Sequence, residues 1–196
     1  MEETARSNPC GVVDPMEKLD RTKLAELILY IAHQSENDRH FGKIKLIKLL
    51  AYADFEAYVR LGHSITGTRY QRLEHGPAPR DAPAILQALR ATGALEETRR
   101  FVGPFSQTRY LARRRPNAAV FDPAELEIVN ELLFRFVNVG AKAISEASHR
   151  DFVGWEMVGE HEDIPYRTAL LSDEAPSEET LARGREILDR LAQRSS

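Results

Sequence analysis

Residues 42–61 have the sequence GKIKLIKLLAYADFEAYVRL, and this segment gives the strongest helix signal in the chain. Its apolar side chains recur every three or four residues, which is the period of an α-helix. The main stripe of this helix is formed by Leu46, Leu49, Leu50, Ala53 and Ala57. Ile44, Ile47 and Phe55 widen the stripe, and a face this wide is typical of a central helix that is covered on two sides. Gly62 follows at a position where glycine commonly ends a helix.

Further helical patterns flank this segment on both sides. They are expected at about residues 20–34, 82–92, 122–139, 142–148 and 178–193. Asp20 and Asp122 stand at helix-capping positions, and Pro123 follows at the first helical position, where its missing N–H is not needed. Two strand-like stretches, residues 95–101 and 107–112, are joined by a turn that contains glycine and proline. The sequence therefore predicts a mainly α fold, a compact helical domain with one wing-like β-hairpin insertion.

The chain is expected to hold one folded domain with an extension at each end. Its 196 residues suit a single domain. We expect a flexible N-terminal arm over residues 1–18, the helical domain over residues 19–171, and an acidic linker with a C-terminal helix over residues 172–196. Inside the domain, residues 76–79 (GPAP) are expected to interrupt regular structure, and residues 151–180 to be irregular and acidic.

The composition excludes several classes of protein. Lysine and arginine number 27 and aspartate and glutamate 30, so the formal net charge is −3 and no overall positive charge favours nucleic acid. Collagen, coiled-coil rods and wholly disordered chains have different compositions. The only cysteine, Cys10, cannot form an internal disulfide, and the sequence contains neither an apolar run of about 18 residues nor a signal peptide. We therefore expect a cytoplasmic protein that has no membrane partner.

Few groups in the sequence are arranged for catalysis. Ser64 lies in a turn between two glycines that resembles a nucleophile elbow, but threonine stands where that motif needs glycine. His149 lies near Glu146 and Asp151, which would suit acid–base work, yet no nucleophile or oxyanion site accompanies it. The histidines lack metal-binding spacing, and no phosphate-binding glycine loop is present. The sequence favours a protein with no catalytic residue, metal or cofactor, and a hydrolase built on His149 or Ser64 is the weaker alternative.

Charge is distributed unevenly along the chain. Residues 99–115, which overlap the expected hairpin, carry six arginines and no acid, whereas residues 151–180 carry nine acids against one arginine. A basic hairpin beside a helix resembles the wing of a winged-helix protein, which can rest on phosphates. The net charge of −3 makes nucleic acid the less favoured partner; the arginines could instead pair with the acidic segment of the same chain or bind another protein. Candidate partner-binding residues are Arg99, Arg100, Arg109, Arg113 and Trp155, of which the tryptophan is alternatively a core anchor.

Several short stretches, taken in order, resemble the Panacea domain of the SocA-like antitoxin family, which is also met in phage-associated proteins. The central helix carries the first of them, KLIKLLAYAD at residues 45–54, and the turn GHSITG at residues 62–67 follows. SEASH at residues 145–149 comes later, with Trp155 six residues on and IPY at residues 164–166 beyond. The residues that match the family's pattern are Lys45, Leu46, Lys48, Leu49, Tyr52, Gly62, Gly67, Tyr70, Gly76, Pro77, Ser145 and His149.

This resemblance implies both a fold and a function. It implies a compact helical domain that binds and neutralises a toxin encoded by a neighbouring gene, and the toxins of different relatives are unrelated to one another. Some relatives also act as proteolytic adaptors that deliver the toxin to a protease. The shared residues mark the fold more than a catalytic site, and no toxin-contact residues carry over, because the contacts should differ with each toxin. We therefore expect an antitoxin that acts by direct protein–protein binding, and the alternative is a nucleic-acid-binding regulator that uses the basic hairpin.

Overall fold

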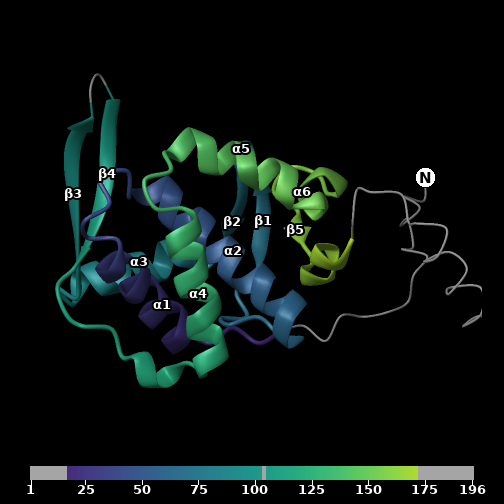
Figure 1. Ribbon diagram of the computed structural model, residues 1–196, viewed down its shortest axis with the longest axis horizontal. Coiled ribbons are helices and arrows are strands. Elements are labelled where there is room, and N and C mark those ends of the chain that lie inside the picture. Colours follow the sequence, from purple (N-terminus) through teal and green to yellow (C-terminus); the bar gives the residue numbers. More distant parts are fainter. Residues whose placement is uncertain (1–16, 103–104, 172–196) are drawn as a thin grey trace, which may run out of the picture.

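A computed structural model describes residues 17–102 and 105–171 of the protein (Figure 1). Most of the expected N-terminal arm, and all of residues 172–196 with the expected C-terminal helix, lie outside these described residues. The helices are α1 (Arg21–Gln34), α2 (Lys43–Leu61), α3 (Ala82–Ala91), α4 (Pro123–Arg135), α5 (Ala141–Asp151) and α6 (Val153–Met157), with the short 3₁₀ helices η1 (Ala118–Val120) and η2 (Tyr166–Leu170). The strands are β1 (Tyr70–Leu73), β2 (Gly76–Pro79), β3 (Leu95–Val102), β4 (Phe105–Ala112) and β5 (Asp163–Ile164). The predicted fold class, mainly α with a β-hairpin, is confirmed.

Helix α2 is central in the structure, as the sequence predicts. It packs against α1, α4, α5, β2 and η2, and Figure 1 shows these elements arranged around it. The side chains of its apolar stripe are almost completely buried, and Leu46, Leu50 and Ala57 are 0% exposed. The helix ends at Gly62, which adopts the left-handed conformation with φ = +80°. Contacts on several sides explain the width of this apolar face, except at Ile44, which is 42% exposed.

The starts of α1 and α4 follow the predicted capping residues. The Asp20 carboxylate accepts a hydrogen bond of 2.9 Å from the backbone N–H of Lys23, and Pro123 is the first residue of α4. Glu125 accepts a hydrogen bond of 2.9 Å from the backbone N–H of Asp122, and it also forms an ion pair of 2.7 Å with Lys23. Because Glu125 is completely buried, this ion pair holds the first turns of the two helices together.

A three-stranded sheet in the order β2-β1-β5 is absent from the sequence prediction. The expectation that residues 76–79 interrupt regular structure is wrong, because these residues form strand β2, antiparallel to β1. The hydrogen bond from the Arg80 N–H to the Arg69 carbonyl oxygen shows which residue pairs of β1 and β2 are hydrogen-bonded and which are not. Pro77 and Pro79 therefore stand at positions that do not bond to β1, on an edge strand, where a missing N–H is tolerated.

The segment after α5 is more regular than predicted. Helix α5 continues to Asp151, and α6, β5 and η2 follow it. The Phe152 ring packs 4.9 Å from the Tyr52 ring and 5.0 Å from the Phe55 ring, centroid to centroid. These aromatic contacts with the central helix order a segment whose local sequence gives no helix or strand pattern.

Strands β3 and β4 form the predicted hairpin, which stands at one side of the helices (Figure 1). Strand β4 lies against α1 and α2, and β3 is the outer strand. Near the base of the hairpin, Leu95 and Tyr110 are buried. Gln107 packs so closely on Gly42 that a Cβ at residue 42 would lie 2.9 Å from the Gln107 Cγ. The base of the hairpin thus belongs to the core, and β4 stays in contact with the domain as far as Gln107.

Candidate functional site

Two lysines of α2 are buried, although lysines normally face solvent. Lys45 and Lys48 are each 2% exposed. The Lys45 ammonium pairs with the Asp38 carboxylate and donates to the carbonyl oxygens of Phe136 and Val139. These three acceptors match the three N–H groups of an ammonium, so Lys45 ties the turn before α2 to the end of α4.

Lys48 has a poorer hydrogen-bonding environment than Lys45. Its Nζ donates to the Pro77 carbonyl oxygen at 3.0 Å, the one hydrogen bond found for this group within the described ranges. Burial lowers the pKa of Lys48 to about 7, since removal from water disfavours the charged form. Gly76 lies beside it with φ = +98°, and a Cβ there would lie 2.6 Å from both Lys48 Nζ and Ser148 Oγ. Glycine is therefore required at residue 76 by its backbone conformation and by the lack of space.

His149 and Trp155 complete the cluster around the β1–β2 turn. Their rings stack with centroids 4.2 Å apart, and the Arg72 guanidinium lies 4.5 Å from the centre of the Trp155 ring. The half-buried indole donates its N–H to the Leu73 carbonyl oxygen at 2.9 Å. Burial is the main cause that lowers the pKa of His149, and the charge of Lys48 lowers it further. Side chains from α2, α5 and α6 thus converge on the β1–β2 turn. We call this group the turn cluster; it consists of Lys48, Gly76, Ser148, His149 and Trp155.

The carboxylates that lie near His149 in the sequence have other partners. Asp151 accepts a hydrogen bond of 2.8 Å from the Tyr52 hydroxyl and pairs with Arg135 at 3.1 Å. Glu146 forms an ion pair of 3.8 Å within α5. In the part of the chain that the structure describes, no three His, Cys, Asp or Glu side chains are grouped so that they could hold a metal ion. The acid–base group of the weaker hydrolase alternative is therefore not assembled among the described residues.

Asp54, a buried carboxylate of α2, holds the turn that follows the helix. It is 0% exposed and accepts hydrogen bonds from the Thr66 N–H at 2.8 Å, the Thr66 hydroxyl at 2.6 Å and the Tyr70 hydroxyl at 2.8 Å. Burial raises the pKa of Asp54 to about 6, although these hydrogen bonds act in the opposite direction. Gly67 has φ = +65°, and a Cβ there would collide with the Lys18 carbonyl oxygen. The turn thus depends on a glycine and on one buried acid.

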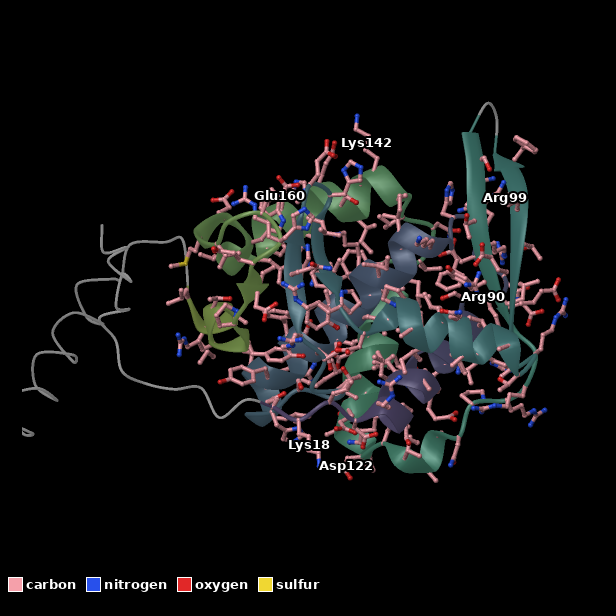
Figure 2. All side chains as sticks on the ribbon, turned by 180° about the vertical axis from the view of Figure 1, so that it is seen from behind. Lys18, Arg90, Arg99, Asp122, Lys142 and Glu160 are labelled. Carbon is pink, nitrogen blue, oxygen red and sulfur yellow. The ribbon has the colours of Figure 1, made fainter. Side chains whose placement is uncertain are left out.

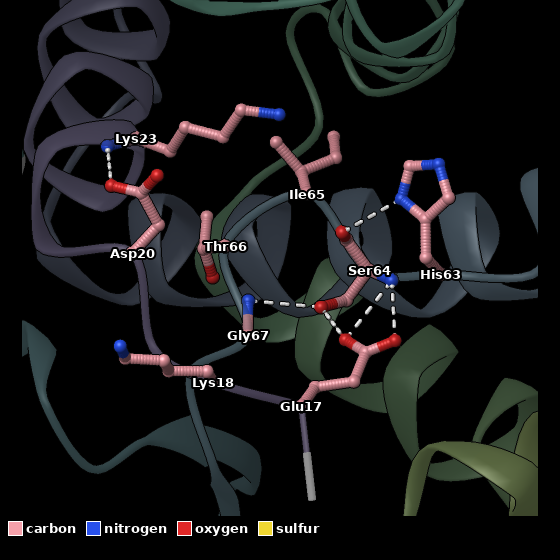
Figure 3. A pocket seen from close by; sticks show the side chains of 9 residues that line it. All are labelled: Glu17, Lys18, Asp20, Lys23, His63, Ser64, Ile65, Thr66 and Gly67. Carbon is pink, nitrogen blue, oxygen red and sulfur yellow. Dashed lines mark hydrogen bonds between the residues drawn. The ribbon is translucent and has the colours of Figure 1, made fainter. Parts of the chain in front are cut away.

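Ser64 stabilises the same turn (Figure 3). Its Oγ accepts a hydrogen bond of 2.9 Å from the Gly67 N–H, and its hydroxyl donates to the Glu17 carboxylate. The same carboxylate accepts a hydrogen bond of 2.9 Å from the Ser64 N–H. Nδ1 of His63 contacts the Ser64 carbonyl oxygen at 3.1 Å and not the hydroxyl. The geometry therefore gives Ser64 a structural role and does not form the nucleophile–base pair that catalysis needs.

The residues that match the family pattern lie mostly inside the molecule. Nine of them are buried, namely Lys45, Leu46, Lys48, Leu49, Tyr52, Gly67, Tyr70, Gly76 and Pro77. Ser145 and His149 are half-buried, and Gly62 is exposed at the end of α2. The Ser145 carbonyl oxygen accepts a hydrogen bond of 2.8 Å from the Ser148 hydroxyl inside α5. Stretches that are far apart in the sequence thus meet through contacts that hold the fold.

The arginines at the base of the hairpin are neutralised within the domain. Arg113 pairs with Glu96 on the neighbouring strand, and Arg114 pairs with Glu26 of α1. Neither of these two arginines pairs with residues 151–171, the described part of the acidic segment. No sequence pattern indicated Glu26 as a partner, because it is 88 residues away from Arg114.

Arg109 requires a correction, because it is not an exposed residue that a partner can reach. It is 7% exposed, and its guanidinium donates to the carbonyl oxygens of Asp38, at 3.0 Å, and Glu36. These bonds fasten β4 to the turn between α1 and α2. An arginine in an amphipathic strand gives no local sign of such distant carbonyl partners.

Arg99 and Arg100 lie in the outer half of the hairpin and are exposed (Figure 2, where Arg99 is labelled). Their cross-strand neighbours, Thr108 and Gln107, carry no charge. No hydrogen bond or ion pair of either guanidinium is found within residues 17–102 and 105–171. Phe101, the next residue, is 78% exposed. We call Arg99, Arg100 and Phe101 the basic edge.

The comparisons with known proteins identify one family. A family model described as antitoxin SocA-like, Panacea domain, matches residues 46–156, which is more than half of the chain. A search among curated proteins found no match. None of the helices in the described ranges has the length and apolar character needed to cross a membrane. The matched range contains the turn cluster and the basic edge.

Proposed function

The chain belongs to the SocA-like antitoxin family with a Panacea domain, and from this membership we propose that it neutralises a cognate toxin by binding directly to it. The family match over residues 46–156 carries the proposal. Membership supports an antitoxin role in general. That the toxin is encoded by a neighbouring gene, and that the two proteins meet in the cytoplasm, are further parts of our proposal.

The way in which the family residues are used favours binding over catalysis. Lys45, Lys48 and Asp54 make contacts inside the domain, and Gly67 and Gly76 allow tight turns. Shared residues that build a fold leave the exterior free to vary, so one scaffold can suit different partners. We therefore propose that the protein acts through its surface and is not an enzyme.

A stable toxin complex needs a substantial surface. Specific complexes typically bury about 1,200–2,000 Å² in total and rely on a few aromatic or arginine anchors. The exterior of the domain offers such groups, including Phe134, which is 83% exposed, and Phe101, which is 78% exposed. Exposed aromatic rings of this kind can serve as such anchors, because aromatic residues are enriched at protein interfaces.

A proteolytic adaptor role is a second form of the same proposal. In this form the chain binds the toxin and delivers it to a protease, which would be its second partner. The two forms differ in the fate of the toxin, because a simple inhibitor leaves the toxin intact and an adaptor shortens its half-life. Measuring toxin half-life in cells with and without this protein separates them.

The test of the antitoxin function is growth of cells that express the adjacent open reading frame under an inducible promoter. We expect growth arrest, relief of that arrest when this protein is co-expressed, and co-purification of the two proteins. A Lys45→Ala variant is a suitable negative control, because loss of the Asp38 ion pair should compromise the fold. A harmless neighbour, or arrest that this protein does not relieve, would contradict the proposal.

Exposure of Arg99 and Arg100 without acidic partners favours one alternative function, a nucleic-acid-binding regulator. Arginines on a projecting hairpin can contact phosphates, and such binding weakens steeply as salt rises. The check is a mobility shift with DNA from upstream of the protein's own gene, at low and moderate salt. Wild-type protein should shift this DNA and an R99E/R100E variant should not; a wild type that never shifts it removes the alternative.

A further inference from the structure

The outer strand of the hairpin, β3, has a free backbone edge. The Arg113 N–H donates to the Ala94 carbonyl oxygen at 2.8 Å, just before the paired region begins. Because bonded and non-bonded pairs alternate in an antiparallel ladder, this bond fixes which β3 residues face β4. The N–H and C=O groups of Glu97, Arg99 and Phe101 therefore point away from β4. Within the described ranges no backbone hydrogen bond reaches these outward groups.

The charge of β3 changes along its length. At the base, Glu97 pairs with Arg90 of α3 and Glu96 pairs with Arg113, so this half is close to neutral. Beyond Thr98 the two arginines of the basic edge follow, and no acid faces them from β4. The outer half therefore carries uncompensated positive charge beside an exposed phenyl ring.

We propose that the free edge of β3 binds an extended, acidic segment of the toxin as an added strand, an inference that rests on the proposed antitoxin function. Strand addition to an exposed edge derives its affinity from main-chain hydrogen bonds and its specificity from side chains. The outward groups of Glu97, Arg99 and Phe101 supply the main-chain bonds. Arg99 and Arg100 form charge-assisted hydrogen bonds with carboxylates of the added strand, and Phe101 packs against its apolar side chains.

Other occupants fit this edge less well. Two copies of the chain that pair about Arg100 would place like charges opposite each other, which is unfavourable. Pairing about Thr98 would set Glu97 opposite Arg99 and Glu96 opposite Arg100, but it would draw these glutamates away from the ion pairs that they form with Arg90 and Arg113. Nucleic acid would use the arginines, but it would leave the outward backbone N–H and C=O groups without the ladder that a peptide strand provides. An acidic strand satisfies both the charge and the backbone of β3.

The experiment measures the affinity of the adjacent gene's product for four variants, alongside rescue of growth. R99E/R100E reverses the charge of the basic edge, and R115E makes the same kind of change at an exposed arginine beyond β4. R99P removes both the charge and the outward N–H, whereas R99T removes the charge and keeps the N–H. Proline at this position breaks no bond to β4, because the Arg99 N–H points outward.

We expect R99E/R100E to weaken binding at least about 100-fold and R115E less than about 3-fold. R99P should bind at least about tenfold more weakly than R99T, because only R99P loses a main-chain bond to the added strand. Circular dichroism and melting temperature establish that each variant is folded. If R99P proves unfolded, the comparison of R99E/R100E with R115E decides whether the edge is the contact.

Four results would overturn the inference. Equal affinities of R99P and R99T would exclude strand addition, and an unchanged affinity of R99E/R100E would exclude the basic edge, while rescue by the wild type would leave the antitoxin function intact. Loss of DNA binding in R99E/R100E, with toxin binding unchanged, would assign the edge to nucleic acid. A wild type that neither binds the neighbouring product nor rescues growth would remove the proposed function, and the inference with it.

Discussion

Helix α2 and the basic edge treat positive charge in opposite ways. Lys45 and Lys48 are buried; three acceptors surround the Lys45 ammonium, whereas Lys48 donates to one carbonyl oxygen among the described residues. Arg99 and Arg100 stand in water without acidic neighbours. A buried cation is costly to disturb because its partners are left without compensation, whereas an exposed one can change freely. The comparison teaches that a buried cation such as Lys45 supports the fold, whereas the exposed arginines of the basic edge can change without disturbing it.

The largest effect on stability is expected for Lys45→Ala, which removes a buried cation. We expect a loss of about 3–5 kcal/mol in the free energy of unfolding, because the change leaves the buried Asp38 carboxylate without its cation. Urea denaturation measures the loss. Lys43→Ala, at an exposed position of the same helix, should cost less than about 0.5 kcal/mol. A loss below about 1 kcal/mol for Lys45→Ala would mean that the buried charge is not what holds α2 to α4.

The second prediction concerns Gly76→Ala in the turn cluster. A left-handed alanine costs roughly 1–2 kcal/mol, and the collision with Lys48 and Ser148 adds roughly 1–3 kcal/mol. Gly93→Ala is the matched control, because Gly93 also has a positive φ, +71°, but nothing lies within 4 Å of its Cβ position. Thermal or urea unfolding should show a larger loss for Gly76→Ala. Equal losses would show that crowding around Lys48 has no energetic weight.

The third prediction uses the pKa of Lys48, which is about 7 in the folded protein and near 10.4 in an unfolded chain. Between these values the unfolded chain binds more protons, so the free energy of unfolding should rise from pH 7 to about 9.5, by at most about 1.4 kcal/mol per pH unit. Below pH 7 both states are protonated and the folded protein bears the full cost of the buried charge. Lys48→Met should flatten the rise measured by urea denaturation at each pH; an identical pH dependence in the two proteins would contradict the assignment.

The smallest effect is expected in the hairpin. Replacing Arg99 and Arg100 together by serine should change the free energy of unfolding by less than about 0.5 kcal/mol, because neither side chain contacts another described residue through a hydrogen bond or ion pair. A melting curve is sufficient to measure it. A large destabilisation would break the contrast, since it would show that the basic edge also supports the fold.

The sequence predicts helices α1 to α5 well, because their signals are local, but it does not predict α6. The apolar stripe of α2, the Asp20 cap and the Asp122-Pro123 start each lie within a few residues of one another, and all appear where expected. The local signal fails for strand β2, because its two prolines normally indicate an interruption of regular structure. They are accepted because the register with β1 places both at positions where no N–H is required.

The candidate site was harder to predict, because its geometry depends on distant contacts. The sequence shows that the hairpin is positively charged, but it does not show which arginines are buried and which are exposed. Arg109 is buried against carbonyl groups 71 and 73 residues away, whereas Arg99 is exposed. The free edge of β3 likewise depends on register, which one bond between Arg113 and Ala94 reveals. Periodicity indicates which face of a strand is apolar, and it does not show which backbone edge stays open.

Glu17 gives the domain a mechanical anchor close to its N-terminal side. Its carboxylate holds Ser64, and the same turn continues to Thr66, which donates two hydrogen bonds to Asp54 in the middle of α2. Tension applied ahead of Glu17, as by an unfolding motor, would therefore pass through the turn to the centre of the main helix. A chain shortened to begin at residue 19 would lose this linkage, and the force needed to unravel the protein from that end should fall.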